Sequence, residues 1–375
     1  MWRLRVSRVA SAALVVVLLL SGCSVGSNEP KVTENTTTEP TNELNMFEQG
    51  CSDFESGLIE HKYLAVYEPI LKDICQDFEM KYELVEVITS PKVDPAKVEY
   101  YVDANVFGLS YWDRYVENGM TKRYLVLLME EEQDWWSEQL DQLLIIEPTW
   151  FGPSAEAGHC YAAEPEAFCP KLYVGNEGDT KGDYDVLTTM LGSKMQWTTF
   201  RRVVPIHEAT HGFQTATQLG HWRYWYVEGQ ATYFELAASV LVPDLRGTNW
   251  RDEQLIQSHA NDEHRFNAKT VDEVVQYMYD CDYGKKRCDG FRYLGASFAH
   301  QLLVNAYGVE TYLAWNLALA EQLPDFNWKV MHERPDDVQR GTRLFATLFE
   351  EFFGLDLETW EREVFAPYVL EHYSL

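Results

Sequence analysis

The sequence has few basic residues and only one long apolar run. Its 375 residues include 31 Lys and Arg against 59 Asp and Glu, which gives a formal net charge of -28. A surface that acidic repels a polyphosphate backbone, so nucleic acid is not an expected partner. A single apolar run excludes several membrane spans, and a 46% hydrophobic content excludes a wholly disordered chain. The composition therefore predicts a globular protein.

The single apolar run lies at the N-terminus and has the form of a secretory signal. Three arginines precede the apolar residues 9–20, a run too short to cross a bilayer. The sequence Leu-Ser-Gly-Cys that ends at Cys23 resembles the cleavage box of bacterial lipoproteins, in which the cysteine becomes the acylated first residue. This resemblance implies a signal peptide over residues 1–22 and a bacterial lipoprotein anchored through Cys23, on the periplasmic face, the outer membrane or the cell surface. An ordinary secretory signal, with Cys23 paired elsewhere, is the alternative.

Cysteine is also scarce. Apart from Cys23 there are six cysteines, an even number in a chain predicted to leave the cytoplasm, which favours disulfides. A metal site built from cysteines is the weaker interpretation, because no Cys-x-x-Cys spacing occurs. Six cysteines allow several pairings, and the local spacings favour Cys51–Cys75, Cys160–Cys169 and Cys281–Cys288.

The chain after the predicted cleavage site divides into a tether and one large unit. Residues 24 to about 45 are polar and almost without apolar side chains, so we expect a disordered tether over residues 23–50. No later linker, low-complexity segment or internal repeat marks another boundary. Residues 51–375 are therefore predicted to form one domain.

Within this domain the sequence pattern changes once, near Asp185. Two short runs of aromatic and β-branched residues, 98–102 and 124–128, predict strands. The fold class that follows is α+β, with a small antiparallel or mixed sheet up to about residue 185 and a mainly helical half after it. Apolar residues at three-to-four spacing predict helices over residues 185–200, 222–240, 271–280, 296–307, 308–321, 336–351 and 357–371.

The most informative segment reads His-Glu-Ala-Thr-His, from His207 to His211. On a helix the two histidines lie one turn apart on the same face, so both imidazoles reach one ion while Glu208 lies beside its open coordination position. Pro205 is expected in the first turn of that helix, which would end near Thr217. A helix with two solvated histidines is the alternative. A catalytic zinc takes three protein ligands and a water, so a third ligand is needed.

A second helical stretch, residues 225–235, supplies that ligand. It reads Trp-x-x-Glu-Gly-x-Ala-x-x-x-Glu and, together with His-Glu-x-x-His, resembles the gluzincin zinc metallopeptidases, which include the M1-type aminopeptidases. The resemblance implies one Zn²⁺ held between two helices. It assigns the zinc ligands His207, His211 and Glu228, the catalytic base Glu208 and the supporting acid Glu235.

A further feature of that family is a tyrosine or histidine that hydrogen-bonds the oxyanion. Tyr293 lies in a stretch that resembles the tyrosine-bearing helix of gluzincins, and His221 and His300 are lesser candidates. A packed, structural Tyr293 is the alternative, because the chain has 22 tyrosines. Aminopeptidase activity is not implied, since the Gly-x-Met-Glu-Asn run that holds a substrate's amino group is missing upstream.

The resulting hypothesis is a lipid-anchored zinc peptidase that acts outside the cytoplasmic membrane. It would hydrolyse peptide bonds with a metal-activated water and with Glu208 as general base. Strands before Asp185 are expected to offer an edge to an extended peptide or polypeptide substrate. Two other functions compete with this one: a binding or chaperone-like lipoprotein that keeps the fold with little turnover, and a zinc hydrolase of a non-peptide amide.

Overall fold

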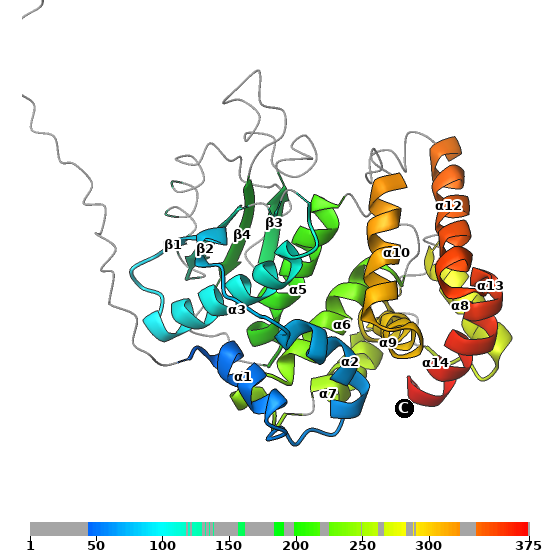
Figure 1. Ribbon diagram of the computed structural model, residues 1–375, viewed down its shortest axis with the longest axis horizontal. Coiled ribbons are helices and arrows are strands. Elements are labelled where there is room, and N and C mark those ends of the chain that lie inside the picture. Colours follow the sequence, from blue (N-terminus) through cyan, green and yellow to red (C-terminus); the bar gives the residue numbers. More distant parts are fainter. Residues whose placement is uncertain are drawn as a thin grey trace, which may run out of the picture. The chain divides into compact units, whose positions relative to one another are not determined.

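The computed structural model describes most of the chain from residue 44 to residue 373 (Figure 1). In this part, no helix combines the length and the hydropathy that a membrane span requires. Several predictions lie outside the described residues: the signal peptide 1–22, the anchor on Cys23, the pairing of Cys160 with Cys169, and His221. The gaps within the described range are residues 118, 121, 130–131, 133–134, 136–137, 139–156, 162–183, 191–198, 218–224, 249, 262–265, 283–287, 289 and 323–334.

The first described helix is α1 (Met46–Glu55), and a capping box stabilises its N-terminus. The Asn45 side chain accepts hydrogen bonds from the backbone N–H groups of Phe47 and Glu48, at 2.9 and 3.0 Å. The Glu48 carboxylate accepts a hydrogen bond from the Asn45 N–H at 3.1 Å, so two otherwise unsatisfied donors are paired. Helix α1 therefore begins within the segment 23–50 that we assigned to the tether.

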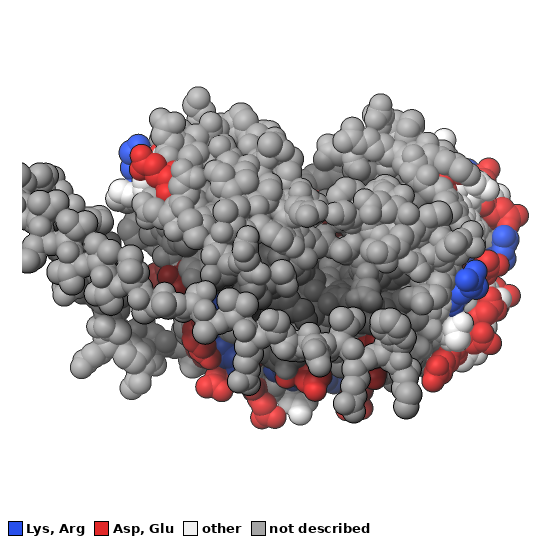
Figure 2. All heavy atoms as spheres, turned by 90° about the horizontal axis from the view of Figure 1, so that it is seen from above, with Lys and Arg blue, Asp and Glu red and all other residues white. Residues whose placement is uncertain are grey.

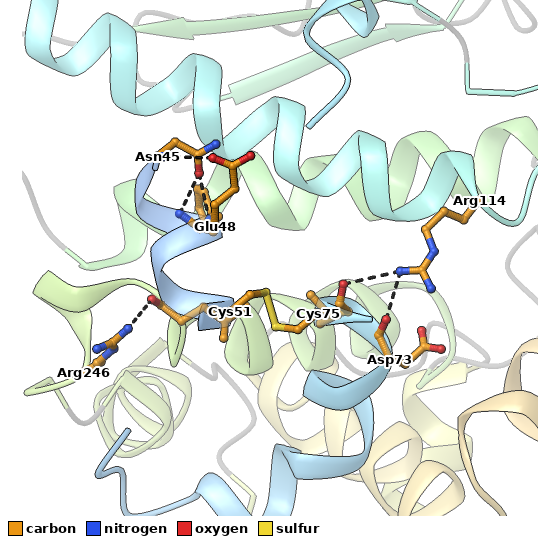
Figure 3. Close-up of a disulfide and its surroundings, with 10 residues drawn as sticks. Asn45, Glu48, Cys51, Asp73, Cys75, Arg114 and Arg246 are labelled. Atoms are coloured by element: carbon orange, nitrogen blue, oxygen red, sulfur yellow. Dashed lines mark hydrogen bonds between the residues drawn. A yellow bond between two sulfur atoms is a disulfide. The ribbon is translucent and has the colours of Figure 1, made fainter. Parts of the chain in front are cut away.

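A disulfide between Cys51 and Cys75 joins α1 to α2 (Leu64–Cys75), as Figure 3 shows. Near it, Arg246 forms an ion pair with Asp53 at 2.7 Å. The predicted disulfide between Cys281 and Cys288 is also present, and it starts from the last turn of helix α8 (Val271–Asp282). Two of the three predicted pairings are thus confirmed.

Among the described residues, the sheet has four strands in the order β1-β2-β4-β3. Strands β1 and β2, and β2 and β4, run parallel, whereas β3 runs antiparallel to β4. The predicted small sheet is confirmed and is mixed, whereas an antiparallel sheet is wrong for two of the three pairings. Helix α3 connects β1 to β2, and such a crossover makes these two strands parallel. The strands are β1 (Val85–Thr89), β2 (Lys122–Leu128), β3 (Ala157–Tyr161) and β4 (Tyr184–Met190).

Two segments take a different secondary structure from the one predicted. Residues 98–102 lie in the helix α3 (Pro95–Asp113), which Asp94 caps by accepting from the Ala96 N–H at 3.0 Å. Their aromatic and β-branched side chains belong to the layer that covers the sheet, where Tyr101 packs in one buried cluster with residues of β2 and β4. The first part of the predicted helix 185–200 is strand β4, because pairing with β2 and a Val-Leu-Thr-Thr run favour the extended chain.

The mainly helical half after β4 is confirmed. Helix α9 has the predicted bounds, and α10 is displaced by one residue from its prediction. The helices longer than one turn are α5 (Thr199–Ala216), α6 (Val227–Ser239), α7 (Trp250–Asn261), α8, α9 (Ala296–Tyr307), α10 (Val309–Gln322), α12 (Pro335–Phe353) and α14 (Ala366–His372). The short elements between them are η2 (Pro243–Leu245), η3 (Phe291–Gly295), α13 (Leu357–Trp360) and η4 (Glu361–Phe365), and η1 (Tyr82–Leu84) precedes β1.

Pro205 lies inside α5, which begins at Thr199, so the prediction that Pro205 stands in the first turn is wrong. Proline has no N–H and removes one intrahelical hydrogen bond at this point. The residues around it, Val203 and Ile206, are fully buried in the main core, and this packing stabilises the turn before the proline. Tertiary packing therefore extends the helix beyond what local propensity predicts.

Close backbone approaches position α5 and α6. A Cβ added at Gly108 of α3 would lie 2.5 Å from the Cβ of Ala209 in α5, so α3 and α5 pack at short range. A Cβ added at Gly229 of α6 would lie 2.7 Å from the backbone of Ala296, at the start of α9. The N-terminal turn of α6 therefore rests directly on the backbone of α9.

We predict that Gly229→Ala destabilises the fold, because the added methyl meets backbone atoms that cannot rotate away. The expected loss of unfolding free energy is about 1–3 kcal/mol, measured by urea denaturation. Gly247→Ala is the matched control, since a Cβ there has no atom within 4 Å. Equal stability losses in the two variants would show that the contact between α6 and α9 is not tight.

Candidate metal centre

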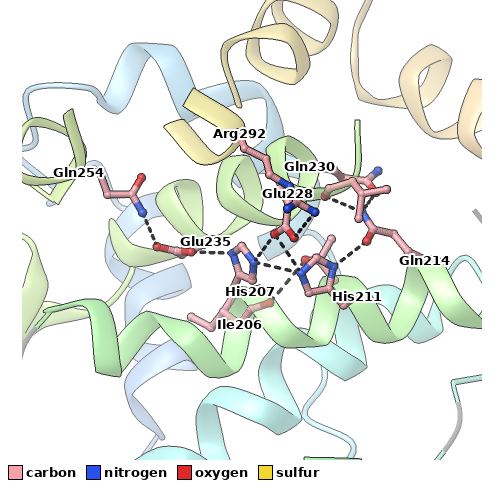
Figure 4. Close-up of polar contacts among 11 residues, drawn as sticks. Ile206, His207, His211, Gln214, Glu228, Gln230, Glu235, Gln254 and Arg292 are labelled. Atoms are coloured by element: carbon pink, nitrogen blue, oxygen red, sulfur yellow. Dashed lines mark hydrogen bonds and ion pairs between the residues drawn. The ribbon is translucent and has the colours of Figure 1, made fainter. Parts of the chain in front are cut away.

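Three side chains from two helices converge on one point. Helix α5 carries His207 and His211, and the first turn of α6 carries Glu228; their ligand atoms all lie within 4.8 Å of one another (Figure 4). The two Nε2 atoms are 3.1 Å apart, and the Glu228 Oε2 atom lies 3.3 Å from one and 3.4 Å from the other. Two imidazole nitrogens and one carboxylate oxygen form a donor set suited to zinc and related metals. These residues could hold one metal ion.

A buried carboxylate orients His207. The Glu235 Oε2 atom lies 2.9 Å from His207 Nδ1, while Glu235 Oε1 accepts hydrogen bonds from Trp250 Nε1 at 2.7 Å and Gln254 Nε2 at 3.0 Å. Because a carboxylate only accepts, Nδ1 carries the proton, and in the neutral imidazole Nε2 is left bare. This outer contact points the Nε2 lone pair of His207 at the other donors, as metal-binding histidines require.

The charges of the cluster favour a cation. Burial alone would lower the pKa of His207, but its hydrogen bonds to Glu228 and Glu235 outweigh burial and hold that pKa well above its usual range. Burial alone would raise the pKa of Glu228, but the charges and hydrogen bonds of His211 and His207 hold it well below its usual range. Protons and a metal ion therefore compete for the same imidazole nitrogens.

Glu208, the predicted base, follows His207 on the same turn of α5. Its side chain is partly exposed, and its backbone carbonyl accepts a hydrogen bond from Arg123 Nη2 at 3.0 Å. Arg123 extends from strand β2, is fully buried and also donates to Asn105 Oδ1 at 2.8 Å. A cation from the sheet thus fixes the backbone under the predicted base, a contact that no local sequence pattern indicates.

The π-helical turn η3 brings two further side chains to the same point. The ring centroid of Tyr293 lies 5.9 Å from that of His207, and Tyr293 is 39% exposed. Arg292, which the sequence analysis missed, has its Nη2 atom 3.4 Å from Glu228 Oε1 (Figure 4). π-Helical turns occur often at functional sites, where they redirect side chains. Tyr293 therefore remains a candidate for contact with a substrate.

His300, a lesser candidate, has a structural place instead. It is fully buried, with Nδ1 2.7 Å from the Tyr312 hydroxyl and Nε2 3.2 Å from the Trp225 carbonyl. Burial lowers its pKa to about 3. The neutral ring therefore holds the chain just before α6, and with it the turn that carries Glu228.

Comparison with known protein families, curated proteins and solved structures finds no match for this chain. The gluzincin resemblance is therefore carried by the motif residues of α5 and α6. What the geometry itself defines is a His-His-Glu group that could hold a metal ion, with its histidines oriented by buried side chains.

We predict that Zn²⁺ stabilises the chain against unfolding through these three residues. At a free concentration 100 times its dissociation constant, the ion should add about 2.7 kcal/mol, and a chelator should remove that gain. His211→Ala should abolish the zinc-dependent rise in melting temperature. His372→Ala on α14, a partly exposed histidine, is the control and should keep it. The same rise in both variants would place the ion elsewhere.

We also predict a contribution of His300 to acid sensitivity. Its pKa is lowered on folding, so the unfolded chain binds the proton first, and stability is lost as the pH falls below the ordinary histidine pKa of about 6.5. Between pH 7.5 and pH 5.5 this loss should be about 1.4 kcal/mol. His300→Gln should be less stable at neutral pH but lose less on acidification, as urea titrations at each pH would measure. Parallel pH profiles of parent and variant would contradict the prediction.

Proposed function

We propose that the protein is a zinc-dependent peptidase, held outside the cytoplasmic membrane by a lipid on Cys23. One observation carries the proposal: a His-His-Glu donor group stands beside Glu208, with a partly exposed Tyr293 at the same point. The donor set fits zinc, because both histidines present Nε2 and the third donor is a carboxylate oxygen. When bound, zinc lowers the pKa of a coordinated water and polarises a carbonyl group.

The chain's own side chains supply the proton transfers. Glu208 takes a proton from the attacking water on its carboxylate and passes that proton to the leaving nitrogen of the amide. The Tyr293 hydroxyl donates a hydrogen bond to the developing oxyanion, an interaction worth roughly 3 to 4 kcal/mol in enzymes where one such donor is removed. His207, His211 and Glu228 would hold the ion through two Nε2 atoms and a carboxylate oxygen, and these atoms must then carry no proton.

The sheet supports a peptide as the substrate. Among the described strands, β3 is an edge, and α5 contacts it. An extended chain that added to this edge by backbone hydrogen bonds would run beside the helix that carries Glu208. The acidic surface in Figure 2, where the described charged side chains are mostly Asp and Glu, would repel acidic peptides and anionic lipid head groups.

We predict that Glu208→Gln keeps one zinc per chain and loses hydrolysis. The amide has nearly the shape of the carboxylate but cannot take a proton, so peptide cleavage should fall by about 10²- to 10⁴-fold. Zinc content would be measured by elemental analysis, and cleavage by digestion of a broad peptide library. Glu350→Gln, at an exposed position of α12, is the matched control. A Glu208→Gln variant that cleaves as fast as the parent would refute this role.

The same digest distinguishes the proposed peptidase from the two other functions, and an assay with small amides separates those two from each other. A binding or chaperone-like lipoprotein would hold zinc and bind peptides without cleaving any member of the library. A hydrolase of non-peptide amides would also leave the library intact, but would release amine from small amide substrates in a reaction that depends on Glu208. The proposal expects peptide cleavage that a chelator stops.

A further inference from the structure

Gln214 is a buried amide that contacts a predicted metal ligand. It lies three residues after His211 on α5, and its Oε1 atom is 2.8 Å from His211 Nδ1 (Figure 4). Its Nε2 atom is 2.9 Å from the backbone carbonyl of Val227 and 2.8 Å from Gln230 Oε1. Gln214 is 3% exposed and Gln230 is 1% exposed. The two amides therefore join α5 to the first turn of α6 in the interior.

The backbone carbonyl decides which way the Gln214 amide points. The Val227 oxygen only accepts, so the atom that faces it must be the NH₂ group of Gln214. The Gln214 oxygen then faces His211 and accepts from its Nδ1, which must carry a hydrogen. In the neutral ring, Nε2 is left bare, and this is the atom that lies 3.4 Å from Glu228 Oε2. The contacts of Gln214 therefore determine the tautomer of His211, with hydrogen on Nδ1.

The donors and acceptors of the hydrogen bonds farther from the metal site can be assigned in the same way. Gln230 Nε2 donates to Asn316 Oδ1 and to the Tyr312 hydroxyl, each at 2.9 Å. Asn316 Nδ2 donates to the Tyr312 carbonyl at 2.7 Å, which fixes the Asn316 amide. At the far end, His300 Nε2 faces the Trp225 carbonyl and must donate to it. His300 Nδ1 therefore accepts from the Tyr312 hydroxyl, whose oxygen is left to accept from Gln230.

The Val227 carbonyl at one end of this network and the Trp225 carbonyl at the other can only accept. Starting from either one gives the same donor and acceptor for every hydrogen bond in between. We infer that Gln214 is a positioning residue, which holds His211 in the tautomer that presents Nε2 to a metal ion, and that Gln230 and the Tyr312–Asn316 pair of α10 hold Gln214 in turn. This inference rests on the proposed metal site. It ties the metal affinity of α5 to the docking of α10, a helix that contributes no ligand to the His-His-Glu group.

The hydrogen-bond network around Gln214 would raise the metal affinity, because breaking the network costs free energy. His211 can rotate about its side-chain bonds, which moves Nε2 away from the metal position, or exchange its proton between nitrogens, which occupies the Nε2 lone pair. A buried, fully paired amide excludes those alternatives, because either one leaves a buried polar atom unpaired. Outer partners of this kind typically change metal affinity by about 10- to 100-fold when they are removed.

The test compares zinc affinity in three variants of the full chain, by competition with a chromophoric chelator. Gln214→Met removes the acceptor and should weaken Zn²⁺ binding by about 10- to 100-fold. Gln214→Glu keeps an acceptor for His211 Nδ1 but loses the NH₂ group that donates to Val227 and Gln230, so it should destabilise the fold yet bind Zn²⁺ more tightly than Gln214→Met. Gln301→Met is the matched control, since Gln301 is a buried amide with two partners, Arg251 and Tyr368, outside the network. It should destabilise the metal-free fold but leave zinc affinity unchanged.

A second readout needs no variant. In the zinc-loaded parent, long-range ¹H–¹⁵N spectra of the histidine rings should show hydrogen on Nδ1 of His211 and on Nε2 of His300. Hydrogen on Nε2 of His211 would overturn the inference, and so would a Gln214→Met variant with the zinc affinity of the parent. A parent chain that binds no zinc would refute the proposed function, and the inference with it.

Discussion

The contact between α5 and α6 is the constraint on which the site depends. The two histidines come from one helix and Glu228 from the other, so the donors meet only if the helices stay in register along and across their axes. Two sets of buried hydrogen bonds fix that register. Glu235 of α6 reaches back to His207, and Gln230 of α6 reaches back to Gln214. Buried polar groups of this kind are costly when unpaired, so small displacements of one helix are penalised at several atoms together.

The C-terminal helices hold α6 in that position. Trp225, just before α6, is 1% exposed and donates to Glu361 Oε1 at 3.0 Å, and its ring packs against Trp360 and Phe365. The Tyr226 hydroxyl donates to Asn316 Oδ1 in α10. The two residues that enter α6 are thus anchored on two separate elements of the C-terminal half. Trp225, the tryptophan of the motif, thus packs in the core just before α6 and fixes the start of this helix. The first turn of α6, which follows it, carries Glu228.

The sequence predicts the donors well and their supports poorly, for a physical reason. His207 and His211 are recognised because helical periodicity places i and i+4 together, whereas Glu228 is recognised through the resemblance of its helix to the gluzincin motif. Trp250 and Gln254 approach Glu235 only through the packing of α7 on α6, which no local pattern encodes. Gln214 was also missed, although its spacing of three residues from His211, which places the two on one helix face, could have indicated it.

The errors in secondary structure have a related origin. Residues 98–102 and strand β4 are apolar on short stretches, and such runs suit a buried helix and a buried strand equally. Their environment decides: the first lies in a capped helix that covers the sheet, and the second pairs with β2. Pro205 misleads in the opposite sense, because it marks a helix start in an isolated chain, whereas the burial of Val203 and Ile206 extends α5 beyond it.

Charge balance argues for a divalent cation at the donor group. Glu228 and Glu235 bring two carboxylates into a largely buried cluster, and coordination requires both histidines to be neutral. The net charge of two carboxylates and two neutral rings is then about two negative units, and a partly exposed Arg292, 3.4 Å from Glu228, offsets part of it. An uncompensated buried charge is expensive. Without a metal, His207 takes up a proton, in keeping with the direction of its pKa. A doubly charged ion would balance these two carboxylates and let both rings coordinate, while the opposite charges of Arg292 and Glu208 offset each other.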